Sequence, residues 1–326
     1  MAARIEAAPH CRLPDLVDLR HLRSLDLEPL LAEEIRNWRD CLDWDFSKSA
    51  ELVRRFLDMR ALHGSALIEN REVIGYAYHV QEDYKGLIGD LYVRRKARTP
   101  ELELRLLDAS VNQLIQSPGI RRIESQLMMA EPRPGHLLPV ADHGCSFERN
   151  FMLLELGLHH PPGPSAVRYP IFVERWSDQY QEQAAQLIAA AYEGHVDSRI
   201  NDQYCSLPGA RRFLFNVVQY PGCGAFFQPA SFAAFDAQTG RMCGMCLASI
   251  VSPDCGHITQ ICVAPWVRAK GIGYELLRQA MAALDTSRCR RVSLTVTASN
   301  QGAVKLYESI GFRTIRKFSA QVWEGF

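Results

Sequence analysis

A pattern of apolar residues recurs after 170 positions, and this internal repeat constrains the fold more than any other feature of the sequence. Without any gap, the shift aligns Leu91-Tyr92-Val93 with Ile261-Cys262-Val263 and Leu106-Leu107 with Leu276-Leu277. Such a period is too long for a solenoid, in which units of about 20–50 residues stack on one another. We therefore predict two copies of one domain.

A proline-rich segment separates the two copies. Residues 159–165 read His-His-Pro-Pro-Gly-Pro-Ser. Three prolines and a glycine within five residues continue neither a helix nor a central strand. The predicted division places a first domain at residues 1–160, a linker at 161–168 and a second domain at 169–326.

Both copies show the same order of elements. In each, a strand and a helix are followed by a β-hairpin, a strand, an amphipathic helix and further strands. This order predicts an α/β fold of the α+β type, with a mixed sheet in each domain. The predicted helices are 27–38, 100–115, 180–192, 271–284 and 301–310, and the predicted strands are 16–20, 65–68, 73–80, 87–93, 122–128, 151–156, 171–175, 232–235, 243–251, 256–263, 291–297 and 314–322.

The charge balance argues against nucleic acid as a partner. Lys plus Arg and Asp plus Glu each number 37, so the formal net charge is zero, whereas non-specific binding of nucleic acid needs a broad basic surface. No apolar run approaches the roughly 20 residues of a membrane-spanning helix, and the N-terminal residues lack the apolar core of a secretory signal. The expectation is a cytoplasmic protein without nucleic-acid or membrane partners.

The cysteines indicate neither a disulfide scaffold nor a metal site. All ten are spaced irregularly along the chain, unlike the regular frameworks of small secreted domains. Cys243 and Cys246 form a C-x-x-C pair, but they lie in an apolar, strand-like run, and no second pair completes a zinc site. We expect reduced thiols and no bound metal.

The strongest chemical signal lies in residues 256–277, where a strand leads through a short basic loop into a helix. Gly271 and Gly273 open this helix, and without a Cβ they allow a ligand to approach the backbone closely. The first N–H groups of a helix lack intrahelical partners and carry a positive dipole, so they bind anions. Arg268 and Lys270 add positive charge. The spacing fits neither a Walker loop nor a dinucleotide-binding loop. The alternative is that the glycines only join a strand to a helix.

Two motifs give the second copy a resemblance to a known family. Arg268-Ala269-Lys270-Gly271-Ile272-Gly273 matches the (R/Q)-x-x-G-x-(G/A) pyrophosphate motif of the GCN5-related N-acetyltransferase (GNAT) superfamily, and Val263-Ala264-Pro265 before it is a common form of the preceding strand end. Residues 300–312 look like the family's N-x-x-A-x-x-x-Y…GF segment. The resemblance covers about residues 170–326 at motif level, while residues 14–158 resemble the fold only in their order of elements.

The resemblance implies roles for individual residues. Acetyl-CoA would be the co-substrate, and Asn300 would hydrogen-bond its arm. Tyr307 would protonate the leaving thiolate, a role that suits a phenol; the alternative is a packed helix aromatic. The backbone beside the pantetheine arm would be that of Ile261, Cys262 and Val263, and the pyrophosphate would be held by Arg268, Ala269, Lys270, Gly271, Ile272, Gly273 and Tyr274.

The residues that serve the acceptor are less clearly marked. His257 is the preferred general base, because it lies on the motif strand fourteen residues before Gly271 and an ordinary histidine pKa near 6.5 suits that task. Strand alternation places it on one face with Thr259 and Ile261, and Cys262 on the other. The alternative is a histidine that satisfies a strand end. A polar cluster of His195, Asp197, Asp202 and Tyr204 either contacts the acceptor or forms a solvated loop.

The first copy is predicted to bind no coenzyme A. The shift of 170 places Pro100, Glu101 and Glu103 at the positions of Lys270, Gly271 and Gly273. Two carboxylates would face a pyrophosphate there, and proline removes one N–H from the helix start. The N-x-x-A-x-x-x-Y segment is also absent after the strand at 122–128. The remaining tasks for this copy are packing against the second domain, completing the acceptor pocket or forming a homodimer.

These observations predict a tandem GNAT protein with a degenerate first half. The predicted activity is transfer of the acetyl group from acetyl-CoA to a primary amine of a small acceptor, directly within a ternary complex. Two other interpretations stay open: a non-catalytic acyl-CoA-binding sensor or scaffold, and an acyltransferase that uses a longer acyl group or an O-acceptor.

Overall fold

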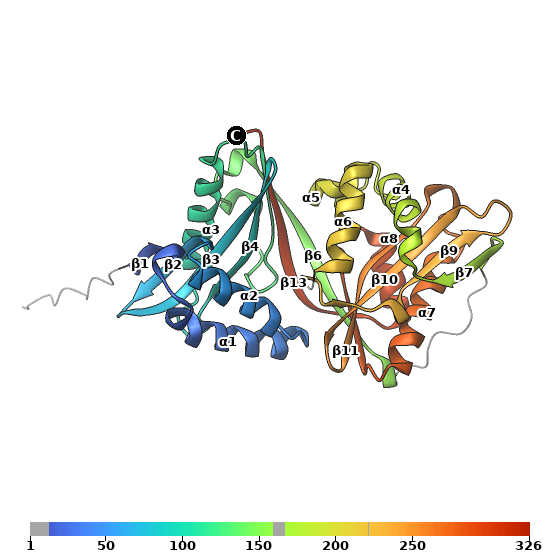
Figure 1. The fold of residues 1–326 in the computed structure, drawn as a ribbon, viewed down its shortest axis with the longest axis horizontal. Coiled ribbons are helices and arrows are strands. Elements are labelled where there is room, and N and C mark those ends of the chain that lie inside the picture. The colour runs from blue at the N-terminus through green and yellow to red at the C-terminus, as the bar shows by residue number, and fades with distance from the viewer. Residues whose placement is uncertain (1–12, 159–166, 221) are drawn as a thin grey trace, which may run out of the picture.

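A computed structural model describes residues 13–158, 167–220 and 222–326. Most of the predicted linker at 161–168 therefore lies outside the described residues. Two α/β units lie side by side and share one mixed sheet (Figure 1). Its strands run in the order β1-β2-β3-β4-β5-β13-β6-β12-β11-β10-β9-β7, and the short β8 pairs with β10.

Within residues 13–158, the first copy supplies six strands and three α-helices. Its elements are β1 (Asp15–Asp18), α1 (Ser24–Leu42), α2 (Ser47–Asp58), β2 (His63–Glu69), β3 (Glu72–Glu82), β4 (Lys85–Val93), α3 (Pro100–Ile115), β5 (Arg122–Gln126) and β6 (Gly144–Glu155). The sequence predicted α1 and α3 but not α2.

In the part of the second copy that the structure describes, there are seven further strands and five α-helices. Its elements are β7 (Ile171–Arg175), α4 (Gln181–Ala191), α5 (Val196–Ile200), α6 (Leu207–Gln219), β8 (Ala225–Phe226), β9 (Phe232–Asp236), β10 (Met242–Ser252), β11 (Cys255–Val263), α7 (Ile272–Thr286), β12 (Arg291–Thr297), α8 (Gln301–Ile310) and β13 (Arg313–Glu324). The helices α5 and α6 were not predicted.

The internal repeat is a repeat of structure. The hairpin β10–β11 begins and ends 170 residues after the hairpin β3–β4, at all four strand boundaries. In both copies the second strand of the hairpin then pairs in parallel with the strand that follows the next helix, β4 with β5 and β11 with β12. The predicted mixed sheet and duplicated α/β fold are confirmed.

The two copies exchange their last strands. The final strand of the second copy, β13, pairs with β5 of the first copy from Ala320↔Gln126 to Glu324↔Arg122. The final strand of the first copy, β6, pairs with β12 of the second copy from Arg291↔Glu155 to Thr297↔Arg149. Strands β6 and β13 also pair with each other, and they run between the two units in Figure 1. Each unit is therefore completed by a strand of the other copy.

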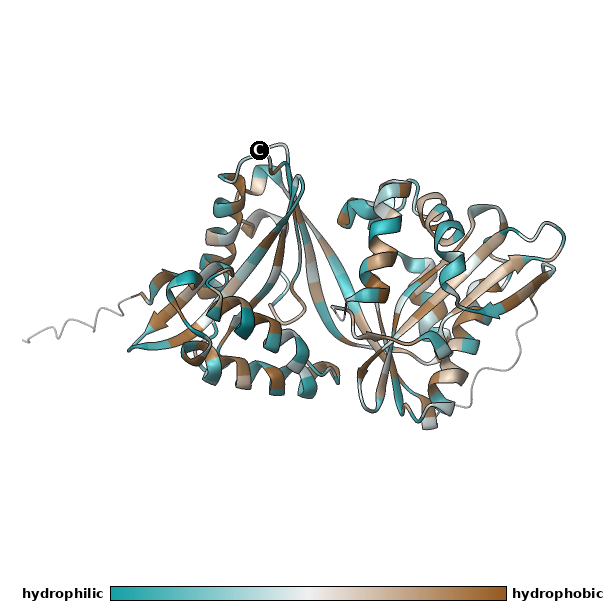
Figure 2. Cartoon of the chain, in the orientation of Figure 1, coloured by the Kyte–Doolittle hydropathy of each residue, from teal (hydrophilic) through white to brown (hydrophobic). Residues whose placement is uncertain are grey.

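Apolar side chains form a core on both faces of the first unit's sheet. On one face, α1 and α2 cover a cluster that includes Leu27, Tyr76 and Phe318. On the other face, α3 covers a cluster that includes Leu107 and Trp323. Figure 2 shows that the helices alternate between hydrophobic and hydrophilic residues, as amphipathic helices on a sheet do. None of the described helices is long and apolar enough to cross a membrane.

The first unit also contains a buried pair of carboxyl groups. Glu34 on α1 is fully buried and accepts hydrogen bonds from the Trp38 indole (3.2 Å) and the Tyr76 hydroxyl (2.8 Å). Burial, and next the nearby Asp90, raise the pKa of Glu34 well above its ordinary value. Burial also raises the pKa of Asp90. The native protein therefore favours the protonated form of Glu34.

We expect this pair to make the protein less stable as pH rises. A carboxyl group whose pKa is higher in the folded state stabilises fully below its unfolded pKa, and this stabilisation is lost as pH rises toward the folded value. Glu34→Gln keeps the shape and removes the titration. Urea unfolding from about pH 5 to about pH 9 should therefore show a smaller loss of stability in the variant. An unchanged pH dependence would assign that loss to other groups.

Candidate functional site

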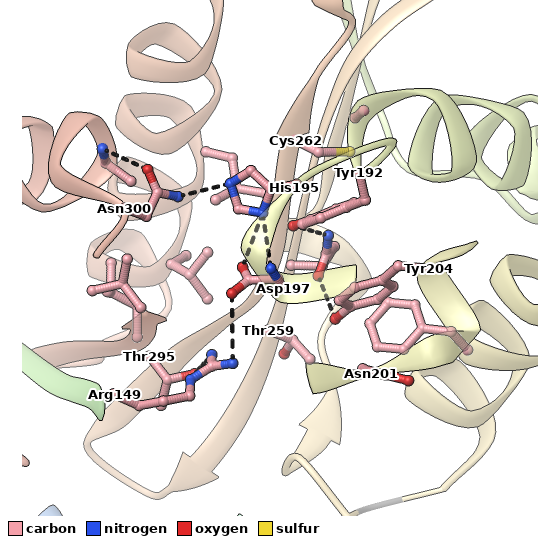
Figure 3. Close-up of a pocket in the computed structure, with 18 of the residues that line it drawn as sticks. Arg149, Tyr192, His195, Asp197, Asn201, Tyr204, Thr259, Cys262, Thr295 and Asn300 are labelled. Atoms are coloured by element: carbon pink, nitrogen blue, oxygen red, sulfur yellow. Dashed lines mark hydrogen bonds and ion pairs between the residues drawn. The ribbon is translucent and has the colours of Figure 1, made fainter. Parts of the chain in front are cut away.

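A cavity opens where β11 and β12 part. The two strands pair in parallel only from Cys255↔Arg291 to Ile258↔Leu294. Beyond that point their side chains line a cavity of about 510 Å³, together with residues from α4, α8 and the segment between α4 and α6 (Figure 3). The cavity reaches Arg268, at the start of the glycine loop. The splayed strands thus connect the predicted anion loop with the predicted acceptor residues.

The glycine loop has the backbone that an anion site needs. Ala269 and Gly271 have φ values of 60° and 86°, in the left-handed region, and Gly271 is the N-cap of α7. A Cβ at Gly273 would meet only a Val263 methyl, at 3.5 Å, which is an ordinary contact. The protein itself therefore leaves room for a side chain at residue 273. A glycine there suits close approach of a ligand to the helix start, so these residues fit a pyrophosphate group.

Asn300 and Tyr307 reach the same cavity from α8. The Asn300 side chain caps this helix, because its Oδ1 accepts a hydrogen bond from the backbone N–H of Ala303 (3.3 Å). Its Nδ2 lies 3.3 Å from the Nε2 atom of His195. Tyr307 is buried and lines the cavity, and burial raises the pKa of its hydroxyl well above the ordinary value. The phenol therefore holds its proton throughout the neutral range and can donate it.

His257 lines the cavity but is more buried than the sequence suggested. It is only 5% exposed, its Nδ1 lies 2.9 Å from the Ser293 hydroxyl, and its ring lies against those of Trp44 and Phe151, with centroids 5.1 and 6.0 Å away. Burial, and then the charge of Arg149, lower its pKa to about 3. The expectation of an ordinary pKa near 6.5 is therefore wrong, because both neighbouring rings come from the first copy and exclude water.

A β-bulge in β11 also changes the predicted faces of this strand. Leu247 pairs with Gln260 and Ala248 with Ile258, so Thr259 has no partner across the ladder. An extra residue of this kind interrupts the alternation of side chains. His257, Thr259, Ile261 and Cys262 all line the cavity. The prediction that Cys262 points away from His257 is thus wrong.

Three of the four predicted acceptor residues lie in the cavity wall: His195, Asp197 and Tyr204. The Nδ1 atom of His195 accepts a hydrogen bond from the backbone N–H of Asp197 (3.1 Å), and this caps α5. The Asp197 carboxylate accepts a hydrogen bond from the Thr297 hydroxyl. Tyr204 donates to the Gln260 side chain (3.3 Å) and stacks on Tyr192. These contacts hold the segment after α4 against strands β11 and β12, which line the cavity.

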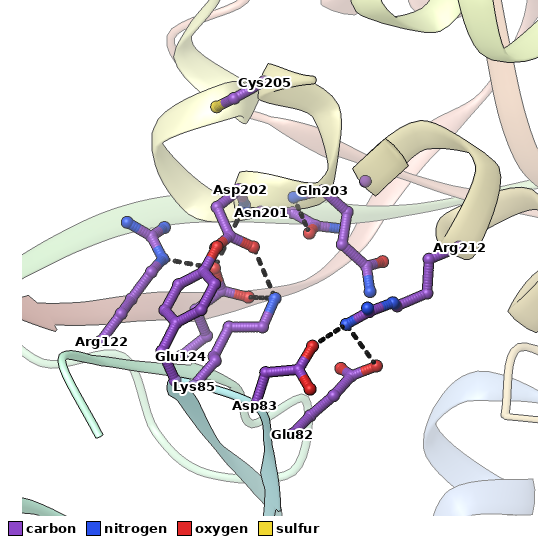
Figure 4. A network of polar contacts seen from close by, with 12 residues as sticks. Glu82, Asp83, Lys85, Arg122, Glu124, Asn201, Asp202, Gln203, Cys205 and Arg212 are labelled. Atoms are coloured by element: carbon purple, nitrogen blue, oxygen red, sulfur yellow. Dashed lines mark hydrogen bonds and ion pairs between the residues drawn. The ribbon is translucent and has the colours of Figure 1, made fainter. Parts of the chain in front are cut away.

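The fourth, Asp202, lies outside the cavity, in a polar network between the two copies (Figure 4). Its carboxylate accepts hydrogen bonds from Lys85 Nζ and the Tyr84 hydroxyl, both at 2.6 Å, and its backbone N–H donates to Glu124. Although burial opposes ionisation, the bonds from Lys85 and Tyr84 hold the pKa of Asp202 below its ordinary value. Asp202 therefore holds the segment between α4 and α6 against the first copy.

The structure adds cavity residues that sequence reasoning missed. Gln126 and Arg149 come from the first copy, and Tyr192 and Gln260 from the second. The first two reach the cleft only because β6 and β13 are exchanged, so no motif in the chain could have indicated them. Gln260 lies within the motif strand β11, and Tyr192 lies just before the predicted acceptor residues. These positions were the only signal in the sequence for either residue.

The equivalent place in the first copy is filled by its own side chains. Glu103 is almost fully buried at the start of α3, where its carboxylate lies 2.8 Å from Arg133 and 3.6 Å from Arg98. The hollow beside Glu103 measures only about 10 Å³. Arg98, the equivalent of Arg268, donates to the backbone oxygens of Val93 and Met129. An internal ion-pair cluster thus occupies the place where the second copy has its anion loop.

No group of three His, Cys, Asp or Glu residues suited to a metal ion exists within the described ranges. The charged side chains that line the cavity are Arg149, Asp197 and Arg268. The cleft therefore offers a cation at the start of the glycine loop, a protonated phenol and one carboxylate, which suits transfer of a group from a phosphate-bearing carrier.

Comparison with known proteins identifies relatives of this arrangement. Residues 200–312 match the Acetyltransferase (GNAT) family. N-alpha-acetyltransferase 30 of Xenopus laevis is 39% identical over 57 residues, which are 18% of this chain and 21% of that protein. The chain thus spans about a fifth of the length of that curated relative.

Two solved structures match almost the whole chain. A GCN5-related N-acetyltransferase from Sphaerobacter thermophilus has a TM-score of 0.62 at 17% identity, covering 96% of this chain and 97% of its own. A tandem GNAT protein from the clavulanic acid biosynthesis pathway has a TM-score of 0.56 at 15% identity, covering 95% and 98%. Identities this low show a shared fold, that of two GNAT-like domains in tandem.

Proposed function

Because the chain carries a GNAT acetyltransferase domain and has the fold of tandem GNAT proteins, we propose that it transfers the acetyl group of acetyl-CoA to an amine in the cleft of the second copy. The observation that carries this proposal is the placement of Tyr307 and of Arg268, the first residue of the glycine loop, along one cavity. The loop can hold the pyrophosphate, and the phenol can meet the leaving sulfur. The proposed division of labour gives catalysis to residues 169–326 and a supporting role to residues 1–160.

Acetyl-CoA would supply an activated acyl carbon, and the chain's residues would bind and orient it. The N–H groups at the start of α7, with Arg268 and Lys270, would hold the pyrophosphate. The backbone of Ile261–Val263 would lie beside the arm, as a further strand would, and a backbone N–H there would polarise the thioester carbonyl. As the amine nitrogen bonds to the acyl carbon, the carbon–sulfur bond breaks, and Tyr307 gives its proton to the sulfur. The nitrogen loses one proton as the amide forms; this proton passes to solvent, and solvent returns one to the phenol.

We propose direct transfer rather than an acyl-cysteine. Cys262 lines the cavity, but burial raises the pKa of its thiol to about 12. Since the thiolate is the nucleophilic form, this cysteine is inert at neutral pH. Acceptor and acetyl-CoA would therefore be bound together.

The role proposed for His257 changes with its environment. An imidazole with a pKa of about 3 is uncharged at neutral pH but accepts a proton weakly. We propose that the acceptor enters as the free amine and that His257 accepts a hydrogen bond from it. The rate should then follow the pKa of the acceptor amine, without an inflection from His257 near pH 6.5.

Calorimetric titration with acetyl-CoA tests the cofactor site. We expect one site per chain, because Glu103 and its arginines fill the first copy. Gly273→Glu should weaken binding at least about tenfold, since the new side chain occupies space left for the ligand and places a carboxylate where the pyrophosphate would lie, as Glu103 does in the first copy.

Gly302→Glu is the matched control. Gly302 is also the second residue of its helix, and a Cβ there meets nothing within 4 Å. It should bind acetyl-CoA as the parent does. Two sites per chain would refute the silent first copy. If acetyl-CoA did not bind, both the acetyl transfer and the acyl-CoA sensor would be refuted. If acetyl-CoA bound but no amine caused release of CoA, the result would favour the sensor.

A further inference from the structure

Arg149 is a charged cavity residue that the proposed acetyl transfer does not use. It lies on β6, where its backbone pairs with Thr297 of β12 and Phe318 of β13. Figure 3 shows its side chain in the cleft beside Thr295, on the far side of Asp197 from His195. The first copy thus places a guanidinium in the cavity of the second.

This guanidinium is buried and incompletely paired. Its side chain is 12% exposed, one terminal nitrogen donates to the Thr295 hydroxyl (3.2 Å), and its Nε has no hydrogen-bond partner among the described residues. The nearest carboxylate oxygen, on Asp197, is 4.0 Å away, at the outer limit of an ion pair. Burying a cation without close counter-charges is costly. The cavity therefore has capacity for one more anion beside Arg149.

The neighbouring groups do not provide Arg149 with a close counter-charge. The Asp197 carboxylate is already bonded to the Thr297 hydroxyl, and His195 lies 3.8 Å from its other oxygen. The other cation of the cavity, Arg268, stands before the glycine loop and donates to the backbone oxygen of Ala191. Arg149 is thus the cation on the acceptor side, separate from the loop that would bind pyrophosphate.

We infer that the acceptor is an amine that also carries a carboxylate, of the α-amino-acid type, and that Arg149 binds this carboxylate. The planar fork of arginine matches a carboxylate with two parallel hydrogen bonds, and the Arg149 side chain lines the cavity. Asp197, 4.0 Å from the guanidinium, suits an amino group close to that carboxylate. The inference rests on the proposed acetyl transfer and specifies its substrate class.

The test compares acids with their amides. The protein with acetyl-CoA is given a panel of L-amino acids and the matching amino-acid amides, and CoA release is followed with a thiol reagent. We expect kcat/KM for the preferred acid to exceed that for its amide about 10- to 100-fold, as the loss of a charged hydrogen bond implies. Arg149→Gln should remove this preference by raising KM for the acid, with the affinity for acetyl-CoA unchanged. Arg149→Lys, which keeps the charge without the fork, should restore part of it.

Lys317→Gln is the control variant. Lys317 is an exposed cation on β13 that pairs with Glu148, and it does not line the cavity. It should keep the preference for acids. A second measurement is calorimetric titration of the CoA-saturated protein with N-acetyl amino acids, which should bind to the parent and bind at least about tenfold more weakly to Arg149→Gln.

Several outcomes would overturn the inference. Acids and amides could react equally well, Arg149→Gln could lower both equally, or no amino acid or N-acetyl amino acid could react or bind. In the last case, CoA release with amines that lack a carboxylate would leave the proposed acetyl transfer intact. A protein that does not bind acetyl-CoA would instead refute the transfer itself, so the two failures are distinguishable.

Discussion

Tyr307→Phe is expected to lower kcat about 100- to 10,000-fold, the usual range for loss of a general acid. The departing sulfur would otherwise leave as an unprotonated thiolate, and the buried phenol, whose raised pKa keeps its proton in place, is the donor that the cavity offers on α8. Phenylalanine keeps the ring and its contact with Phe312. The affinity for acetyl-CoA should therefore change little. Single-turnover CoA release and calorimetric titration measure the two quantities separately.

Tyr204→Phe is the comparison variant. It removes another hydroxyl from the same cavity, but this one donates to Gln260 and belongs to the acceptor wall. We expect its main effect on KM for the acceptor. If Tyr307→Phe turned over at the rate of the parent, or if both variants lost kcat equally, Tyr307 would not be the proton donor.

The features that could be predicted from the sequence are those whose residues lie close together in the chain. The glycine loop, Asn300 and Tyr307 lie within two short segments with characteristic spacing, so their nearness to one cleft followed from the motifs. The duplication was visible because β10 has the same length as β3, β11 has the same length as β4, and the shift of 170 residues aligns them without a gap. That the first copy binds no coenzyme A stays a prediction; it rests on Pro100, Glu101 and Glu103, and in the structure Glu103 lies beside two arginines.

Features that depend on contacts between residues far apart in the chain could not be predicted. The helices α2 and α5 carry no strong start or stop motif, so they were not predicted. Helix α6 was also not predicted, although its N-cap Ser206 and Pro208 in its first turn form a start signal. The low pKa of His257 depends on Trp44 and Phe151, and Arg149 enters the cleft only through strand exchange. None of these contacts leaves a local signal. A single sequence therefore shows the motif of a site but not the side chains that pack around it.

The same exchange predicts that the two units unfold together. Trp323 lies on β13, yet it is fully buried in the core of the first unit, where its indole N–H donates to the Pro139 backbone oxygen (2.7 Å). Trp323→Ala should therefore destabilise the protein by about 3–5 kcal/mol, as other large-to-small changes of a core aromatic do. The measurement is urea unfolding, with hydrogen exchange of β2–β4 as the probe of the first unit and acetyl-CoA binding as the probe of the second.

Both probes should shift together, because β13 lies between β5 and β6, and β6 in turn pairs with β12. Loss of order in the first unit frees β13 and β6, and the second unit then loses the strand beside its cleft together with Arg149. Ile315→Ala is the control, since Ile315 lies on the same strand but is 44% exposed; changes at such surface positions usually stay within about 0.5 kcal/mol. If Trp323→Ala weakened the first unit while acetyl-CoA binding kept its urea midpoint, the exchanged strands would not couple the units, and the first copy would support the cleft by contact alone.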